Sequence, residues 1–129
     1  IIFDCRFDLM KKNLGYDKYL ESHICGAHYI NLELDLSSEV TDHSGRHPLQ
    51  TIKKFTDILN NFGINNNSQV VVYDDENSSM AARLWWMLRL VGIKKCAVLD
   101  GGFKYWTKNK FSVDNLMPKN KAKENTIAA

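Results

Sequence analysis

The sequence predicts an α/β fold of three layers, α/β/α, with a central parallel sheet. The first observation is the run Val70–Tyr73, which is apolar at every position, as expected of a strand buried on both faces. The second is the nearly continuous apolar stretch from Met80 to Val91, which ends at Gly92 and predicts a helix. The third is the alternation of strand-like and helix-like patterns along the chain, which favours parallel strands joined by right-handed crossovers.

The individual elements follow from short patterns taken in order. The chain opens on an apolar run, and Tyr16, Tyr19 and Leu20 then recur at helical spacing. A longer helical pattern follows Pro48 and ends at Gly63. The expected strands are 1–4, 29–32, 70–73 and 96–99, and the expected helices are 16–22, 49–62, 80–91 and 103–110. We expect the strands to be parallel, in the spatial order 29–32, 1–4, 70–73, 96–99.

Composition narrows the class of protein. With 129 residues, 44% hydrophobic and 25% charged, the chain has the size of one soluble domain, expected over 1–111, with a tail or interdomain linker over 112–129. The net charge of +2 indicates neither a nucleic-acid nor a membrane partner, and no apolar run approaches the roughly 18 residues of a membrane-spanning helix. Cys5, Cys25 and Cys96 form no CxxC pair, which argues against a disulfide framework or metal site and fits a reducing, cytoplasmic location. We expect no cofactor.

The candidate site is the acidic loop between the 70–73 strand and the helix that follows. A loop at the carboxyl end of a central strand, opening onto a helix N-terminus, is where α/β sheets bind anions and place nucleophiles. Here the loop contains no cysteine, and its three carboxylates are expected to stabilise the helix N-terminus, with Asn77, Ser78 and Ser79 as competent N-caps. The loop consists of Asp74, Asp75, Glu76, Asn77, Ser78, Ser79 and Met80.

Other polar residues among apolar segments predict a structural network. Asp4 and Arg6 follow the first strand and are expected to pin neighbouring loops. Arg83 lies inside an apolar helix, so we expect it to be at least half-buried and paired with a carboxylate. His23 is expected to be structural, and Asp100 begins an Asp-Gly-Gly turn where the backbone can approach a neighbour closely.

Six pieces of sequence, in order and suitably spaced, resemble the rhodanese-like (sulfurtransferase) family. They are Asp4-Cys-Arg6, Tyr19-Leu-Glu-Ser-His-Ile-Cys-Gly-Ala27, Arg46-His-Pro-Leu49, Val71-Val-Tyr-Asp74, Ala82-Arg-Leu-Trp-Trp-Met-Leu-Arg89 and Val98-Leu-Asp-Gly-Gly-Phe-Lys-Tyr-Trp106. The match extends from Asp4 to Trp106 and is most similar to the N-terminal domain of two-domain thiosulfate or 3-mercaptopyruvate sulfurtransferases. Ser22 and Cys25 depart from the glycine and proline of the family pattern, so that turn is expected to be less rigid.

The resemblance implies a rhodanese-like fold and a division of labour between two modules. In that branch only the C-terminal module carries the nucleophilic cysteine, and Asp74 stands at the corresponding position here. The chain is therefore expected to be inactive alone and to support a catalytic C-terminal rhodanese domain of the same polypeptide, whose substrate is a small sulfur-donor anion. We also expect the chain to be a fragment, because the family's leading strand and helix and a second module are absent. Exposed apolar side chains are accordingly expected on the 96–99 strand and the 80–91 helix.

Other functions are weighed against this one. The chain could be a stand-alone, catalytically dead module that binds or regulates another protein, or it could act through Cys25 or Cys5, although neither follows the central strand. A Cys-x5-Arg phosphatase loop is excluded because Asp74 and Met80 occupy the two positions, and the surroundings of an aspartyl-phosphate site are missing. We further expect Asp75 and Glu76 to repel an anionic donor, and the loop not to direct its N–H groups at a persulfide.

Overall fold

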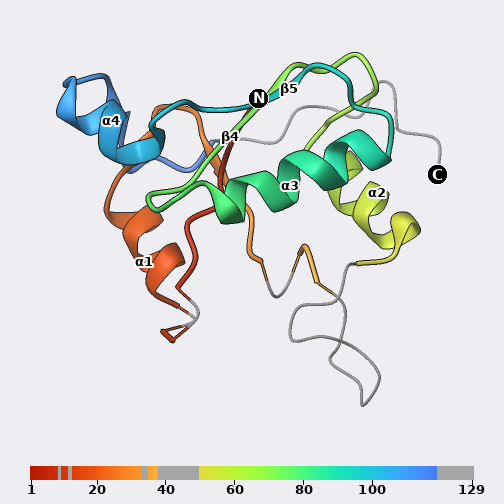
Figure 1. Ribbon diagram of the computed structural model, residues 1–129, viewed down its shortest axis with the longest axis horizontal. Helices are drawn as coiled ribbons and strands as arrows, with labels where there is room; N and C mark the ends of the chain where they lie inside the picture. The colour runs from red at the N-terminus through yellow and green to blue at the C-terminus, as the bar shows by residue number, and fades with distance from the viewer. Residues whose placement is uncertain (9, 12, 33–34, 38–49, 119–129) are drawn as a thin grey trace.

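The computed structural model describes residues 1–8, 10–11, 13–32, 35–37 and 50–118, and the fold is given for these residues (Figure 1). The motif Arg46-His-Pro-Leu49 lies outside them. The elements in order are β1 (Ile2–Asp4), α1 (Leu14–Glu21), β2 (His23–Ile24), β3 (His28–Tyr29), α2 (Ile52–Asn61), β4 (Val70–Tyr73), α3 (Ser79–Leu90), β5 (Cys96–Val98), α4 (Gly102–Lys108) and β6 (Val113–Asp114).

The central sheet has four parallel strands in the order β3-β1-β4-β5, which confirms the predicted order and direction. The register pairs Ile2 with Val71 and Asp4 with Tyr73. Because parallel strands end at the same edge, the residues after Asp4 and Tyr73 emerge side by side. This register therefore brings Cys5 next to the start of the acidic loop, where the Cys5 N–H donates to the Tyr73 carbonyl at 2.7 Å.

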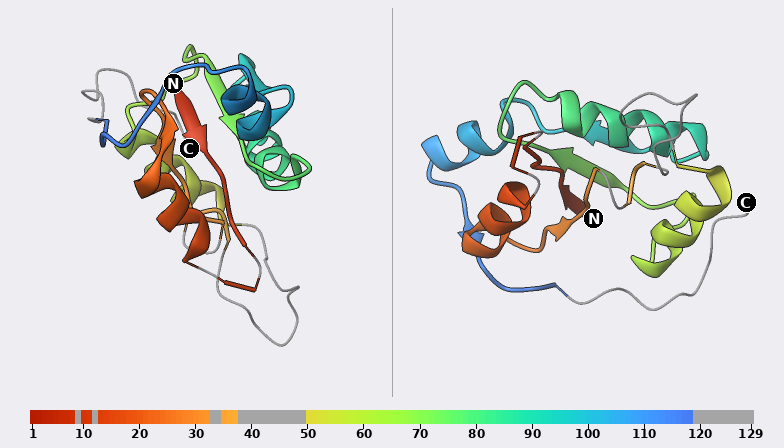
Figure 2. Two further views of the ribbon diagram at one scale, coloured as in Figure 1. Left: turned by 90° about the vertical axis from the view of Figure 1, so that its left-hand side faces the viewer. Right: turned by 90° about the horizontal axis from the view of Figure 1, so that it is seen from below.

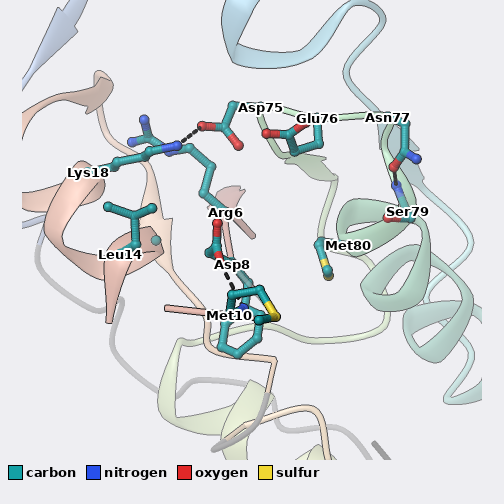
Figure 3. A pocket seen from close by; sticks show the side chains of 12 residues that line it. Arg6, Asp8, Met10, Leu14, Lys18, Asp75, Glu76, Asn77, Ser79 and Met80 are labelled. Atoms are coloured by element: carbon teal, nitrogen blue, oxygen red, sulfur yellow. Dashed lines mark hydrogen bonds and ion pairs between the residues drawn. The ribbon is translucent and has the colours of Figure 1, made fainter. Parts of the chain in front are cut away.

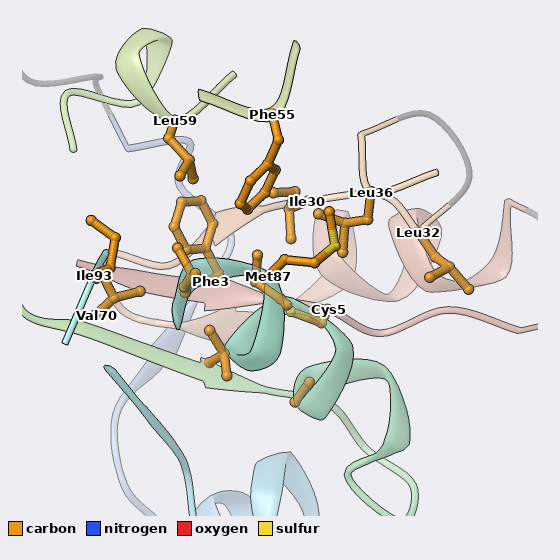
Figure 4. Close-up of a cluster of buried hydrophobic side chains, with 14 of the residues drawn as sticks. Phe3, Cys5, Ile30, Leu32, Leu36, Phe55, Leu59, Val70, Met87 and Ile93 are labelled. Carbon is orange, nitrogen blue, oxygen red and sulfur yellow. The ribbon is translucent and has the colours of Figure 1, made fainter. Parts of the chain in front are cut away.

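Helices cover both faces of the sheet, as the three-layer prediction requires. Figure 2 shows α1 and α2 on one side of the strands and α3 and α4 on the other. The main core lies around Phe3 of β1, which meets Phe62 edge-on at 4.9 Å between ring centroids, with Leu59 of α2 packed beside it (Figure 4). On α3, Leu84 and Met87 contribute to the same core. These contacts bury the apolar stripes that the sequence periodicity predicts.

Helix boundaries differ from the predicted ones at several ends. Helix α2 begins at Ile52, and its N-cap is Thr51, whose hydroxyl accepts a hydrogen bond from the Lys54 N–H at 3.3 Å. The prediction that this helix starts directly after Pro48 is therefore wrong, because a threonine cap sets the first turn; Pro48 itself lies outside the described residues. Helix α1 begins at Leu14, two residues earlier than predicted.

Part of the expected tail lies against the domain. Strand β6 pairs antiparallel with β2, with His23 opposite Asp114 and Ile24 opposite Val113. Trp106 of α4 donates its indole N–H to the Ser112 carbonyl at 2.9 Å, which holds the start of this segment. Residues 119–129 lie outside the described part of the chain.

Surface features agree with the sequence on several points. Trp86 and Leu90 of α3 are 47% and 53% exposed, and Ala97 of β5 is exposed, as expected. Among the described residues, no helix is long and apolar enough to cross a membrane, and no three His, Cys, Asp or Glu side chains group as metal ligands would. The three cysteines are free thiols.

Candidate functional site

The acidic loop, residues 74–80, leaves the carboxyl end of β4 and leads into α3. Asp74, its first residue, is only 2% exposed. The loop closes through Ser78, which has a left-handed backbone (φ 69°) and occupies the N-cap position of α3. A non-glycine residue in this conformation is uncommon. Beyond it, the Ala81 N–H donates back to the Asp74 carboxylate.

Three backbone N–H groups converge on the Asp74 carboxylate. Its Oδ1 accepts from the N–H groups of Glu76 and Ser78, both at 3.1 Å, and its Oδ2 accepts from the Ala81 N–H at 2.9 Å. We call these three donors the amide cradle. All three N–H groups point at the side chain of residue 74, a direction that the sequence did not predict.

The cap of α3 also differs in detail from the prediction. Ser78 is the N-cap residue, but its side chain makes no capping hydrogen bond. Asn77 Oδ1 accepts the Ser79 N–H at 3.2 Å, and Asp74 accepts from Ser78 and Ala81 within the first turn. The carboxylate of Asp74 thus supplies the negative charge and the acceptors that the N-terminus of α3 favours.

Helix α4 fixes the backbone of Asp74 from the other side. The Phe103 N–H donates to the Asp74 carbonyl at 2.9 Å. Gly102 has φ +59°, and a Cβ there would lie 2.6 Å from the Asp74 carbonyl oxygen. This position therefore excludes any side chain, and the close approach predicted for the Asp-Gly-Gly turn is confirmed.

The three acids of the loop have separate surroundings. Asp75 forms an ion pair with Lys18 of α1, with its Oδ2 3.0 Å from Nζ, whereas Glu76 is exposed to solvent. The amide cradle supplies hydrogen bonds to both oxygens of Asp74. The loop is consequently less repulsive toward an anion than its sequence indicates. Lys18 was not predicted as a site residue, because nothing in the sequence pairs it with a residue 57 positions away.

A cavity of about 340 Å³ lies in front of the acidic loop, between α1 and the segment that follows β1 (Figure 3). Lys18 and Asp75 lie on its wall as an ion pair, Leu14 and Met80 add apolar surface, and Arg6 also contributes. Asp74 is not among the residues that line it. The side chain of residue 74 therefore faces the amide cradle rather than this cavity.

Asp4 and Arg6 form a buried ion pair beneath the loop. Arg6 Nη2 lies 2.7 Å from Asp4 Oδ2, and Arg6 also donates to the Ser22 carbonyl at 2.6 Å. The Tyr73 hydroxyl donates to Asp4 Oδ2 at 2.8 Å and accepts the Ile24 N–H at 3.2 Å. Burial raises the pKa of Asp4, and the Arg6 guanidinium opposes that shift. The network joins β1, β2 and β4 and includes Tyr73, which the sequence reasoning missed.

The other predicted network residues lie elsewhere. His23 is buried, with Nδ1 2.7 Å from the Tyr19 carbonyl and Nε2 2.7 Å from the Leu116 carbonyl, so it joins α1 to the C-terminal segment. Arg83 is half-buried as expected, and two of its partners are the Leu36 carbonyl and the Ser37 hydroxyl, each at 3.2 Å. Asp100 is exposed, and none of the hydrogen bonds given for Asp4 among the described residues involves it.

Neither alternative nucleophile has an activating environment. Burial raises the pKa of the Cys5 thiol well above its usual range, and the carboxylates of Asp4 and Asp74 raise it further. Cys25 is exposed, and desolvation, together with a hydrogen bond to Asp114, raises its pKa as well. Both shifts disfavour the thiolate, which is the nucleophilic form of cysteine.

Comparison with known proteins places these features in a family. The family model described as rhodanese-like domain matches residues 1–109. A probable 3-mercaptopyruvate sulfurtransferase of Pseudomonas aeruginosa is 39% identical over 108 residues, which are 82% of this chain and 38% of that protein. The 3-mercaptopyruvate sulfurtransferase of Escherichia coli K12 is 33% identical over 94 residues, covering 71% of this chain and 32% of its own length.

Solved structures give the same result. The 3-mercaptopyruvate sulfurtransferase of Leishmania major superposes with a TM-score of 0.83 at 29% identity, covering 99% of this chain and 35% of that chain. A 3-mercaptopyruvate sulfotransferase from Escherichia coli gives a TM-score of 0.81 at 28% identity, over 99% of this chain and 49% of that chain. The chain thus spans less than half the length of each of these proteins.

Proposed function

The chain belongs to the rhodanese-like domain family, and from this premise we propose that it is a catalytically inactive domain of a two-domain thiosulfate or 3-mercaptopyruvate sulfurtransferase. Its role would be to pack against a catalytic C-terminal rhodanese domain of the same polypeptide, to form one wall of the cleft and to stabilise that domain. The observation that carries the proposal is the buried carboxylate of Asp74 at the place of the family's nucleophile.

The chemistry of sulfur transfer supports the absence of activity. A thiolate attacks the outer sulfur of the donor and becomes a persulfide, which then passes that sulfur to an acceptor. A carboxylate is a poor nucleophile toward sulfur, and Asp74 is further withdrawn because three N–H groups hold both of its oxygens. Cys5 and Cys25 offer no substitute, since the surroundings of both thiols disfavour the thiolate.

The assignment to a longer sulfurtransferase is supported by the relatives. Those named above are called sulfurtransferases, and this chain matches 38% and 32% of the length of the two that were compared in sequence. We infer two parts of the proposal from that similarity alone. They are the substrate class, a small sulfur-donor anion, and the partner domain in the same chain. We place the protein in the cytoplasm because its three cysteines are free thiols, which fits a reducing compartment.

The test is sulfur transfer by this chain alone. We expect no thiocyanate above the buffer rate from thiosulfate and cyanide, and no pyruvate from 3-mercaptopyruvate with a thiol acceptor. The variant Cys25→Ser serves as a control, since it shows whether any residual signal arises from the exposed thiol. Turnover by the unmodified chain that is unaffected by Cys25→Ser would overturn the proposal.

The same-chain partner is tested separately. The parent reading frame is expected to encode a second module with a cysteine directly after its central strand. A frame that encodes only this domain would favour a stand-alone binding module instead.

A further inference from the structure

His23 is a fully buried histidine whose two ring nitrogens both face carbonyl oxygens. Nδ1 lies 2.7 Å from the Tyr19 carbonyl oxygen, and Nε2 lies 2.7 Å from the Leu116 carbonyl oxygen. A carbonyl oxygen accepts hydrogen bonds and cannot donate them, and a neutral imidazole has one N–H group and one nitrogen lone pair. With a neutral ring, one lone pair would point at a carbonyl oxygen across 2.7 Å. The two contacts therefore fit a ring that carries a proton on both nitrogens.

The surroundings of the ring favour a positive charge at both nitrogens. Asp114 Oδ1 lies 3.4 Å from His23 Nε2, close enough for a carboxylate to stabilise an imidazolium. On the other side, Tyr19 lies in the last turn of α1, which ends at Glu21. Its carbonyl is therefore at the negative end of the helix dipole, where a cation is stabilised.

The other titratable groups around His23 leave this charge in place. The Tyr19 ring stacks on the imidazole at 3.8 Å between centroids, and burial raises the pKa of the Tyr19 hydroxyl to about 12, so this ring stays neutral. Arg6 donates to the carbonyl of Ser22, the residue before His23, but its own charge is balanced by Asp4. The guanidinium thus adds little repulsion.

The groups on the side of β2 and β4 are neutral. Burial raises the pKa of the Tyr73 hydroxyl, which accepts the Ile24 N–H. Desolvation, together with a hydrogen bond to Asp114, raises the pKa of the Cys25 thiol. Asp114 is accordingly the carboxylate that faces the imidazole.

The ring joins α1 to the stretch that follows α4, residues 112–118, which we call the exit segment. The Leu116 N–H donates to Asp114 Oδ1 at 3.2 Å, so the two acceptors near His23 Nε2 hold each other in place. Strand β6 in this segment has two residues and pairs with β2 (Figure 2). A ladder this short is marginal alone. The contact with His23 is therefore a substantial part of what holds the exit segment.

We propose that His23 is a proton-dependent clasp: as an imidazolium it ties the exit segment to α1, and loss of one ring proton releases that segment. The loss turns one of the two carbonyl contacts from a hydrogen bond into a repulsion between lone pairs. The exit segment is the side that yields, because Leu116 is 69% exposed whereas Tyr19 is fully buried within a helix. The clasp does not rest on the proposed inactivity of the chain. It concerns the start of the expected linker over 112–129, which it would anchor at low pH and free at high pH.

The experiment is NMR of the whole chain, with 15N in the backbone and in the histidine rings, titrated from about pH 5 to 9. At about pH 6, burial alone would leave a histidine neutral, because desolvation disfavours the charged ring. We expect both ring nitrogens of His23 to resonate as protonated nitrogens at that pH. The signal of His23 is the one lost in His23→Gln, and if that variant does not fold, Asp114→Asn identifies it by its shift.

Release of the exit segment is followed in the same titration. We expect the backbone amide signals of Val113 and Leu116 to shift with the same midpoint as the His23 ring, while that of Val72 in β4 stays constant. Titration of the control ring, His28, which packs against Phe62, is not expected to move them. A His23 ring with an unprotonated nitrogen at about pH 6 would overturn the proposal, and so would exit-segment signals that do not follow the ring.

The variant Asp114→Asn tests the counter-charge. It keeps a side-chain oxygen at the same place but removes its charge, and we expect the ring to bind its proton about three- to tenfold more weakly, since Asp114 is partly exposed. Equal proton binding would overturn the role assigned to Asp114. None of these measurements depends on turnover, so sulfur transfer by the unmodified chain would refute the proposed function alone.

Discussion

The hydroxyl of Tyr73 is the centre of the buried network, and its removal gives the sharpest test of how the fold is held together. It donates to Asp4 Oδ2 at 2.8 Å and accepts the Ile24 N–H at 3.2 Å, so that one oxygen joins β4 to β1 and β2. The ring itself is fully buried and stacks on Phe103 at 5.8 Å between centroids. Tyr73→Phe removes the oxygen and leaves this packing in place.

The expected loss is worked out from the two bonds. A hydrogen bond to a charged acceptor contributes about 1.5–3 kcal/mol, and a buried N–H left without a partner, as in Ile24, costs about 1–3 kcal/mol. Asp4 keeps its ion pair with Arg6, so the carboxylate remains compensated and the two effects do not add in full. We expect Tyr73→Phe to lower the free energy of unfolding by about 2–4 kcal/mol, out of the roughly 5–15 kcal/mol typical of a domain.

The assay is equilibrium unfolding in urea, followed by circular dichroism and by tryptophan fluorescence. The matched control is Tyr105→Phe, because the side chain of Tyr105 is 54% exposed, and we expect it to change the free energy of unfolding by less than about 0.5 kcal/mol. A loss for Tyr73→Phe no larger than that of the control would refute the reasoning. It would mean that water or a small backbone shift satisfies both partners.

Two further predictions concern stability. Gly15→Ala would place a Cβ against the Arg6 carbonyl, a backbone group that cannot rotate away. We expect it to lower the free energy of unfolding in urea by about 1–3 kcal/mol, and an unchanged urea midpoint would contradict this. Burial raises the pKa of Tyr19 to about 12 and those of Tyr29 and Tyr73 further, whereas the unfolded value is about 10. Above pH 10 the native state therefore binds more protons than the unfolded state. The contribution of these three tyrosines to the free energy of unfolding is fully present below pH 10. It falls above pH 10 by up to about 4 kcal/mol per pH unit. Urea midpoints that stay constant from pH 9 to about 11.5 would show that these tyrosines are not protected.

The sheet could be predicted because its signals are local and strong. A strand buried on both faces must be apolar throughout, and Val70–Tyr73 meets this condition with β-branched and aromatic residues. The right-handed crossover rule then leaves few arrangements, and the order β3-β1-β4-β5 is one of them. The resemblance of the spaced motifs to the rhodanese-like family then selected one of these strand orders.

Elements that form through tertiary contacts, rather than from a periodic sequence pattern, were harder to predict from the sequence. Strand β6 has two residues, Val113 and Asp114, in a stretch of polar composition, and it exists through its pairing with β2. The start of α2 depended on which of two competent residues begins the first turn, and the side chain of Thr51 takes that role through a hydrogen bond. Neither choice leaves a periodic signal in the sequence.

The site shows the same division. The sequence showed that residue 74 begins the loop after the central strand and that it is not a cysteine. The direction of the N–H groups could not be predicted, because it depends on how the loop folds around the Asp74 carboxylate. The left-handed backbone of Ser78 is part of that fold, and serine residues rarely adopt this conformation. The charge of Asp75 was likewise counted as repulsive, although an ion pair with Lys18 balances it in the fold.

The amide cradle and the carboxylate of Asp74 stabilise each other, and this pairing holds the shape of the loop. The Asp74 carboxylate is only 2% exposed and would be costly to bury without these N–H groups, and the buried Ala81 N–H would be costly to leave unpaired. A neutral, short side chain at position 74 satisfies neither condition. Aspartate does, since it supplies charge and two acceptors from the same backbone position. Aspartate at position 74 therefore preserves the local fold of the loop beside the cavity.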